Sequence, residues 1–314
     1  MALQLKDLSE KSRIKGHIAT YLGLTALFCS GVYYMCARTG NIGAGLGLIS
    51  YSLIVMWCPG LAALLTCRLR GIPIADLGWK WQPSKYQLLA YAIPILYTAA
   101  AYFTIWLTGN GGFYNQEFVA KVAKTFGWSL PDGCVIALFV LLVGTFGMVR
   151  SMASALGEEI GWRGFLVPHL AKLGSYTATS LWSGVIWSLY HYPLLLWSNY
   201  NSAGPKWFSL LCFTVMIVSS CFVFTWLRLK SGSLWTGVVM HASHNLFIQI
   251  IFTPLTFDTG NTRYSIDEFG IGLPIVSTIA GYVFWRKRNE LPDANSPVRS
   301  PLVADDGSPG ASMP

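Results

Sequence analysis

Eight long apolar runs dominate this chain and restrict it to folds in which helices cross a membrane. A helix rises about 1.5 Å per residue, so about 20 apolar residues cross the roughly 30 Å hydrocarbon core of a bilayer. The sequence therefore predicts an all-α, polytopic membrane protein with about eight transmembrane helices. The runs cover approximately residues 18–37, 43–67, 86–107, 134–156, 175–197, 208–227, 234–254 and 270–285.

The composition agrees with a membrane protein, since 53% of the 314 residues are hydrophobic and only 11% are charged. The formal net charge of +8 requires no nucleic acid, because membrane proteins collect Lys and Arg in their cytoplasmic loops. Most basic residues lie in loops that eight spans would place on the side of the termini. We therefore expect a multi-pass protein of the plasma (inner) membrane with both termini in the cytoplasm and the lipid bilayer as a partner.

The chain divides into one membrane domain and two polar ends. We expect residues 1–16 to be a cytoplasmic N-terminal segment and residues 17–288 to form the membrane domain. Residues 289–314, rich in Pro, Ser, Asp and Gly, are typical of a disordered cytoplasmic tail. Spans four to seven, residues 134–254, carry the ionisable side chains and are the predicted functional core. No pattern sets the oligomeric state.

Two adjacent glutamates lie at predicted membrane depth, where a carboxylate costs about 2.5 to 3.5 kcal/mol. Glu158 and Glu159 point different ways, because helix neighbours differ in direction by about 100°. Arg163 follows Glu159 by four residues, which predicts an ion pair. Trp162 follows Glu158 by four residues and is predicted to be an apolar neighbour that desolvates it, as suits a general base. A purely structural Glu–Arg clamp is the alternative.

Histidines occupy two further runs. His191 follows Trp187 by one turn, and His241 and Asn245 are four residues apart, hence on one helix face. An imidazole and an amide aimed at one point can stabilise a tetrahedral oxyanion. We expect His244 to support His241 and Asn245 rather than to take part in the chemistry itself. Taken singly, each histidine suits a hydrogen-bonded core position, but with the glutamates they predict a common site.

Three ordered patterns resemble the motifs of the CAAX protease and bacteriocin-processing family of intramembrane endopeptidases: Glu158-Glu159-x-x-x-Arg163, Trp187-x-x-x-His191 and His241-x-x-x-Asn245. This family includes type II CAAX prenyl endopeptidases and lysostaphin-resistance-type proteins. The resemblance covers about residues 152–248. Trp187 stands where the family usually has Phe, which implies a different pocket size.

The resemblance implies hydrolysis of a peptide bond in a membrane-delivered peptide or membrane protein. Glu158 would activate a water that His191 helps to hold. His241 and Asn245 would stabilise the oxyanion, and Arg163 would orient Glu159. The sequence itself does not identify the substrate.

Metal dependence is open at this stage, although no metal and no cofactor are favoured. The family has often been described as metalloproteases, but this chain has no His-Glu-x-x-His pattern. If zinc is bound, Glu158, His191 and His241 are the predicted ligands. Those residues can equally position a water without metal.

Two other classes of function use the same residues. A non-proteolytic membrane scaffold or immunity-type protein would retain the site as a binding surface. A proton-coupled carrier would explain intramembrane Glu and His, but no inverted repeat is visible, and carrier function does not account for His241 and Asn245. The limits of the apolar runs also place His241 near the cytoplasmic end of its span and His191 farther toward the outer end. Whether the two side chains lie close together therefore depends on how the spans pack.

Overall fold

The computed structural model describes residues 2–46, 49–201 and 204–292. Most of the tail predicted for residues 289–314 therefore lies outside the described residues. Helix dominates the described part, and its strands are two short antiparallel pairs, Gly45–Leu46 with Ile49–Ser50 and Gly112–Phe113 with Thr256–Phe257. The predicted all-α class is confirmed.

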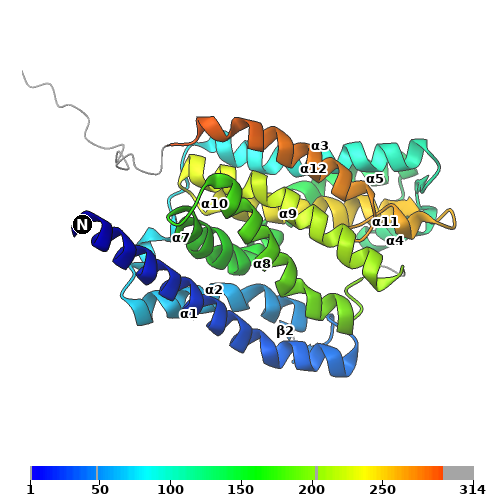
Figure 1. The fold of residues 1–314 in the computed structure, drawn as a ribbon. Coiled ribbons are helices and arrows are strands. Elements are labelled where there is room, and N and C mark those ends of the chain that lie inside the picture. The colour runs from blue at the N-terminus through cyan, green and yellow to red at the C-terminus, as the bar shows by residue number, and fades with distance from the viewer. Residues whose placement is uncertain (1, 47–48, 202–203, 293–314) are drawn as a thin grey trace, which may run out of the picture.

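Figure 1 shows an elongated helical bundle in which the start of α1 and the end of α12 lie at the same end, while α4, α5 and α11 lie at the other. The helices are α1 Ala2–Thr39, α2 Tyr51–Arg70, α3 Ser84–Leu107, α4 Gln116–Phe126, α5 Asp132–Leu142, α6 Met148–Glu159, α7 Val167–Ala171, α8 Tyr176–Trp197, α9 Lys206–Ser231, α10 Trp235–Asn245, α11 Thr253–Leu255 and α12 Gly272–Arg286.

Six helical segments of the described chain are long and apolar enough to cross a membrane, as a multi-pass membrane protein requires. The predicted count of eight is not confirmed. The two remaining apolar runs are helical but fall short. Helix α12 has only 15 residues, about 22 Å of rise, and the 22 residues of α8 include Ser, Thr and His side chains that lower its hydropathy.

Helices α5, α6 and α7 form one continuous helix interrupted by π-helical segments at Val143–Gly147 and Ile160–Leu166. A third π-helical segment, Leu246–Phe252, follows α10 directly. π-Helical turns occur frequently at functional sites, because they change the direction of side chains relative to a regular helix. Two of the three begin directly after candidate site residues, one after Glu159 and one after Asn245.

Small residues let α6 approach α1 and α2 closely. A Cβ on Gly157 would lie 2.5 Å from the Met56 carbonyl oxygen, and a Cβ on Gly161 would lie 2.5 Å from the Tyr21 hydroxyl. Glycines four residues apart commonly permit such backbone contact between membrane helices. The glutamates between these two glycines are fully buried.

Candidate active site

Glu158 is fully buried at the end of α6, and its two carboxylate oxygens have different surroundings. Oε2 accepts hydrogen bonds from the indole N–H of Trp162 at 2.8 Å and from that of Trp187 at 2.6 Å. Oε1 has no hydrogen-bond partner among the described residues and lies 3.8 Å from His191 Nε2. The prediction that Trp162 is a purely apolar neighbour is therefore wrong: its indole reaches back one turn and donates.

Glu159 joins two motifs through one oxygen. Oε1 accepts a hydrogen bond from Arg163 Nη1 at 2.9 Å and lies 2.9 Å from His241 Nδ1. The predicted Glu159–Arg163 pair is confirmed. The guanidinium stacks between the rings of Trp187 and Phe224, 4.1 and 3.8 Å from their centroids, which adds cation–π attraction. Glu159 thus holds His241, while Glu158 faces His191.

The hydrogen bonds of the two imidazoles indicate which nitrogens carry hydrogen. His191 Nδ1 lies 3.0 Å from the Trp187 carbonyl oxygen, which can only accept, so Nδ1 donates and the neutral ring presents a lone pair on Nε2. His241 Nδ1 donates in the same way to the Glu159 carboxylate. Each histidine therefore keeps Nε2 for other partners.

Charge within this buried cluster balances when one histidine is protonated. Glu158 and Glu159 carry two negative charges when ionised, and Arg163 supplies one positive charge. Buried charges are tolerated when they are paired. A proton on His241, which already contacts Glu159, brings the sum to zero.

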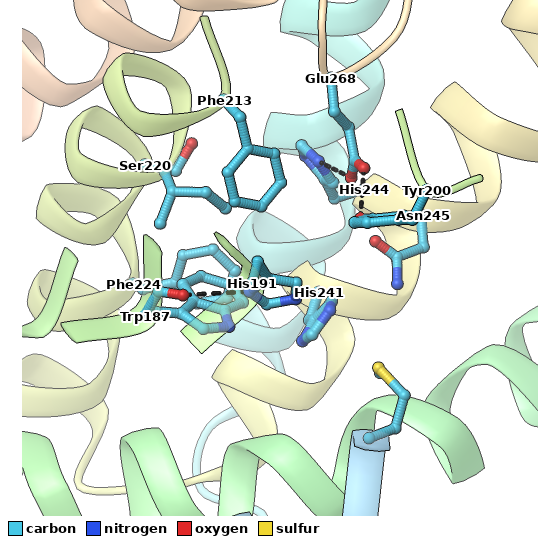
Figure 2. Close-up of a pocket in the computed structure, with 12 residues that line it drawn as sticks. Trp187, His191, Tyr200, Phe213, Ser220, Phe224, His241, His244, Asn245 and Glu268 are labelled. Carbon is cyan, nitrogen blue, oxygen red and sulfur yellow. Dashed lines mark hydrogen bonds and ion pairs between the residues drawn. The ribbon is translucent and has the colours of Figure 1, made fainter. Parts of the chain in front are cut away.

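A cavity of about 40 Å³ lies between α8, α9 and α10 and is lined by His191, His241, His244 and Asn245, as Figure 2 shows. Its volume is enough for one water or a few. Glu158, Glu159 and Arg163 lie behind these residues and do not line it. Among the described residues, no hydrogen-bond partner is found for the Asn245 amide. The structure thus brings the predicted residues of three helices together.

His191 and His241 lie close together, although the apolar runs of the sequence predict different membrane depths for them. The ring of Trp187, one turn before His191, lies 5.3 Å from the His241 ring, measured between centroids. Both histidines line the same cavity, and α10 begins among buried residues. Ser233 and Leu234, which precede it, are fully buried, and the Leu234 N–H donates to the Gly78 carbonyl oxygen.

The sequence analysis missed a second acidic group on the pocket wall. Glu268, in the loop before α12, is 3% exposed. Its Oε1 lies 3.2 Å from His244 Nε2, and its Oε2 accepts from the Tyr200 hydroxyl at 2.7 Å. His244, which also hydrogen-bonds to Tyr97, therefore lines the pocket itself. The only signal in the sequence is the Asp267-Glu268 pair, and loop acids are ordinarily exposed.

Burial and hydrogen bonding act in opposite directions on these loop acids. Burial alone would raise the pKa of Glu268, but hydrogen bonds from His244 and Tyr200 outweigh it and lower that pKa below its usual value. Burial, together with the neighbouring Glu268 carboxylate, raises the pKa of Asp267 to about 7.

The residues predicted to bind zinc, if zinc is present, are not arranged as a ligand set. In the part of the chain that the structure describes, no group of three or more His, Cys, Asp and Glu side chains is placed to hold a metal ion. We derive no step through a metal from this arrangement.

Comparison with known proteins points in one direction. The family model for Rce1-like type II CAAX prenyl endopeptidases matches residues 138–247, a range that includes all the residues of the three motifs. CAAX prenyl protease 2 of Methanococcus maripaludis is 29% identical over 160 residues, which is 50% of this chain and 53% of that protein. The chain therefore spans about half the length of that curated relative.

Proposed function

We propose that this chain, which belongs to the CAAX protease and bacteriocin-processing family, is an intramembrane endopeptidase that hydrolyses a peptide bond in a membrane-delivered peptide or protein. The observation that carries this proposal is the asymmetry of Glu158. Two indole N–H groups hold one carboxylate oxygen, and the other oxygen is open toward His191 Nε2 at 3.8 Å.

The nucleophile in this proposal is a water between Glu158 Oε1 and His191 Nε2. Both atoms accept hydrogen bonds, so one water can donate a hydrogen to each and direct its lone pairs toward a substrate carbonyl. As the water oxygen attacks the carbonyl carbon, one proton passes to Glu158. Glu158 later returns that proton to the leaving amine as the carbon–nitrogen bond breaks.

The oxyanion would be stabilised from α10. His241 and Asn245 line the cavity one turn apart, and the Asn245 amide has no hydrogen-bond partner among the described residues. Protonation of His241, favoured by the charge balance with Glu158, Glu159 and Arg163, would turn Nε2 into a donor. Donors fixed before the reaction stabilise the developing charge without reorganisation. Glu159 and Arg163 would act as positioning residues by holding the His241 ring.

The test is cleavage of a quenched peptide library by detergent-purified protein, comparing wild type with Glu158→Gln and Glu117→Gln. Glutamine keeps one oxygen for both indoles, so Glu158→Gln should fold, but loss of the base should lower kcat roughly 100- to 10,000-fold. Glu117, exposed on α4, is the matched control and should leave cleavage unchanged.

Each result separates the candidate functions. Equal activity of Glu158→Gln and wild type would remove Glu158 from the mechanism. If a chelator abolishes the activity of the wild type, the mechanism needs a metal ion rather than a water activated by Glu158 alone. If folded wild-type protein cleaves no peptide, the scaffold or immunity-type function replaces the peptidase.

A further inference from the structure

A second cavity, of about 250 Å³, lies away from the candidate active site, at the end of the bundle that holds the start of α1. Its walls come from α1, from the end of α2 with the loop after it, and from α7. Three cationic side chains line it: Arg13, Arg70 and Lys172. The imidazoles of His17 and His169 also face it, with ring centroids 5.7 Å apart.

Among the described residues, no carboxylate forms an ion pair with these cations. Neither the Arg13 nor the Lys172 side chain makes an ion pair or a hydrogen bond to a described residue, and Arg70 donates only to the Thr20 hydroxyl, at 2.6 and 3.1 Å. Two acids, Glu10 and Asp76, also line the cavity, and neither lies within ion-pair distance of the three cations. The lining therefore carries a net positive charge, with cationic groups available to a ligand.

The cavity lies where two candidate membrane spans end, which is where the headgroup layer of a bilayer is expected. The candidate spans Tyr51–Arg70 and Asp132–Ala171 end at its wall, and Lys172 is the next residue. At the same end of the bundle the Trp235 indole, at the start of another span, donates to the Trp79 carbonyl oxygen. Tryptophan is enriched at membrane–water interfaces. A ligand here would sit where lipid phosphates lie.

We propose that this cavity binds a phosphate group, supplied by an anionic phospholipid headgroup. Basic pockets between membrane helices are suited to such headgroups. Arg13 and Lys172 would contact the phosphate. His169 Nδ1 donates to the Phe165 carbonyl oxygen at 2.7 Å, so the neutral ring has only an acceptor left on Nε2 and would not donate to the phosphate. This proposal is independent of the peptidase function.

The test measures lipid retention by native mass spectrometry of the detergent-purified full chain, with phosphatidylglycerol and phosphatidylcholine as probes. The variant Arg13→Gln/Lys172→Gln removes two charges whose side chains contact no described residue by hydrogen bond or ion pair. Each basic residue near a membrane surface contributes an about fivefold change in affinity, so we expect roughly 25-fold weaker phosphatidylglycerol binding. The matched control is Lys15→Gln/Arg68→Gln, which removes the same charge outside the cavity.

A second arm distinguishes a lipid from soluble phosphate. Inorganic phosphate, compared with chloride at equal ionic strength, is tested for an increase in thermal stability. Suppose that phosphate stabilises the wild type, that the Arg13/Lys172 variant loses this effect, and that neither lipid is retained selectively. The phosphate site would then stand, but its ligand would be a soluble phosphate rather than a lipid. Equal weakening by both double variants, or no response to either probe in wild type, would overturn the proposal.

Discussion

His244 Nε2 and Glu268 Oε1 lie 3.2 Å apart on the wall of the candidate active-site pocket, although one belongs to α10 and the other to the loop before α12. With the Tyr200 hydroxyl on the second oxygen of Glu268, this contact ties residues 256–271 to the pocket. The loop is thus held by a few polar contacts that mutation can remove separately.

Glu268→Gln should therefore loosen this loop. Hydrogen bonds to a charged group contribute about 1.5 to 3 kcal/mol, so amide hydrogen exchange in residues 256–271 should accelerate roughly 10- to 100-fold, as measured by mass spectrometry. Exchange in α2 should not change, and Glu117→Gln should leave the loop unaffected. Unchanged protection of the loop in Glu268→Gln would show that apolar contacts alone hold it.

Loop stability should also depend on pH through Asp267. Its pKa of about 7 when folded exceeds the usual value of about 4. The closed loop therefore binds a proton that the open loop releases, and its stability should fall as pH rises from about 4 to about 7. The lowered pKa of Glu268 adds a loss of stability only at more acidic pH, as pH falls below its usual value of 4.5.

Asp267→Asn should abolish the neutral-range part of this dependence. Asn tolerates the positive φ of 62° at this position, and its side-chain oxygen can still accept from the Glu268 N–H. Exchange rates of the loop, corrected for the intrinsic effect of pH, should then be flat between pH 5 and 7.5. A wild-type profile that persists in Asp267→Asn would assign the dependence to another group.

Removing Arg163 should leave Glu159 as a buried and poorly compensated charge. Arg163→Met should lower the free energy of unfolding by about 3 to 5 kcal/mol. Because the damage comes from the remaining carboxylate, Glu159→Gln/Arg163→Met should be less destabilised than the sum of the single variants. Unfolding in mixed micelles of SDS and a mild detergent measures all three. Strict additivity would contradict the pairing.

Gly237 permits α10 to approach Glu159. A Cβ at this position would lie 2.5 Å from Glu159 Oε2 and 3.0 Å from Arg163 Cγ, so Gly237→Ala should destabilise the protein by about 1 to 3 kcal/mol. Gly23→Ala in α1 is the control, because nothing lies within 4 Å of its Cβ and alanine favours a helix. The same unfolding assay compares them, and equal stability of the two variants would refute close packing at Gly237.

Several features of the site were predictable because they depend on local spacing. Glu159 and Arg163 are four residues apart on a helix, and their ion pair is confirmed. His241 and Asn245, at the same spacing, both line the pocket. Their catalytic roles stay predictions.

Other features depend on segments far apart in the chain. Trp187, 29 residues after Glu158, donates to it only because α8 packs against the end of α6. Glu268 enters the pocket because its loop folds back onto α10. No local pattern distinguishes these contacts from ordinary core packing or an exposed loop.

The sequence by itself determined the helical class, the three motifs and the residues that share a helix face, since apolar content and the helical repeat act over a few residues. Tertiary structure alone decided that His191 and His241 line one cavity and that two indoles hold Glu158. These outcomes depend on where each helix begins relative to its neighbours and on how closely glycines let the helices approach.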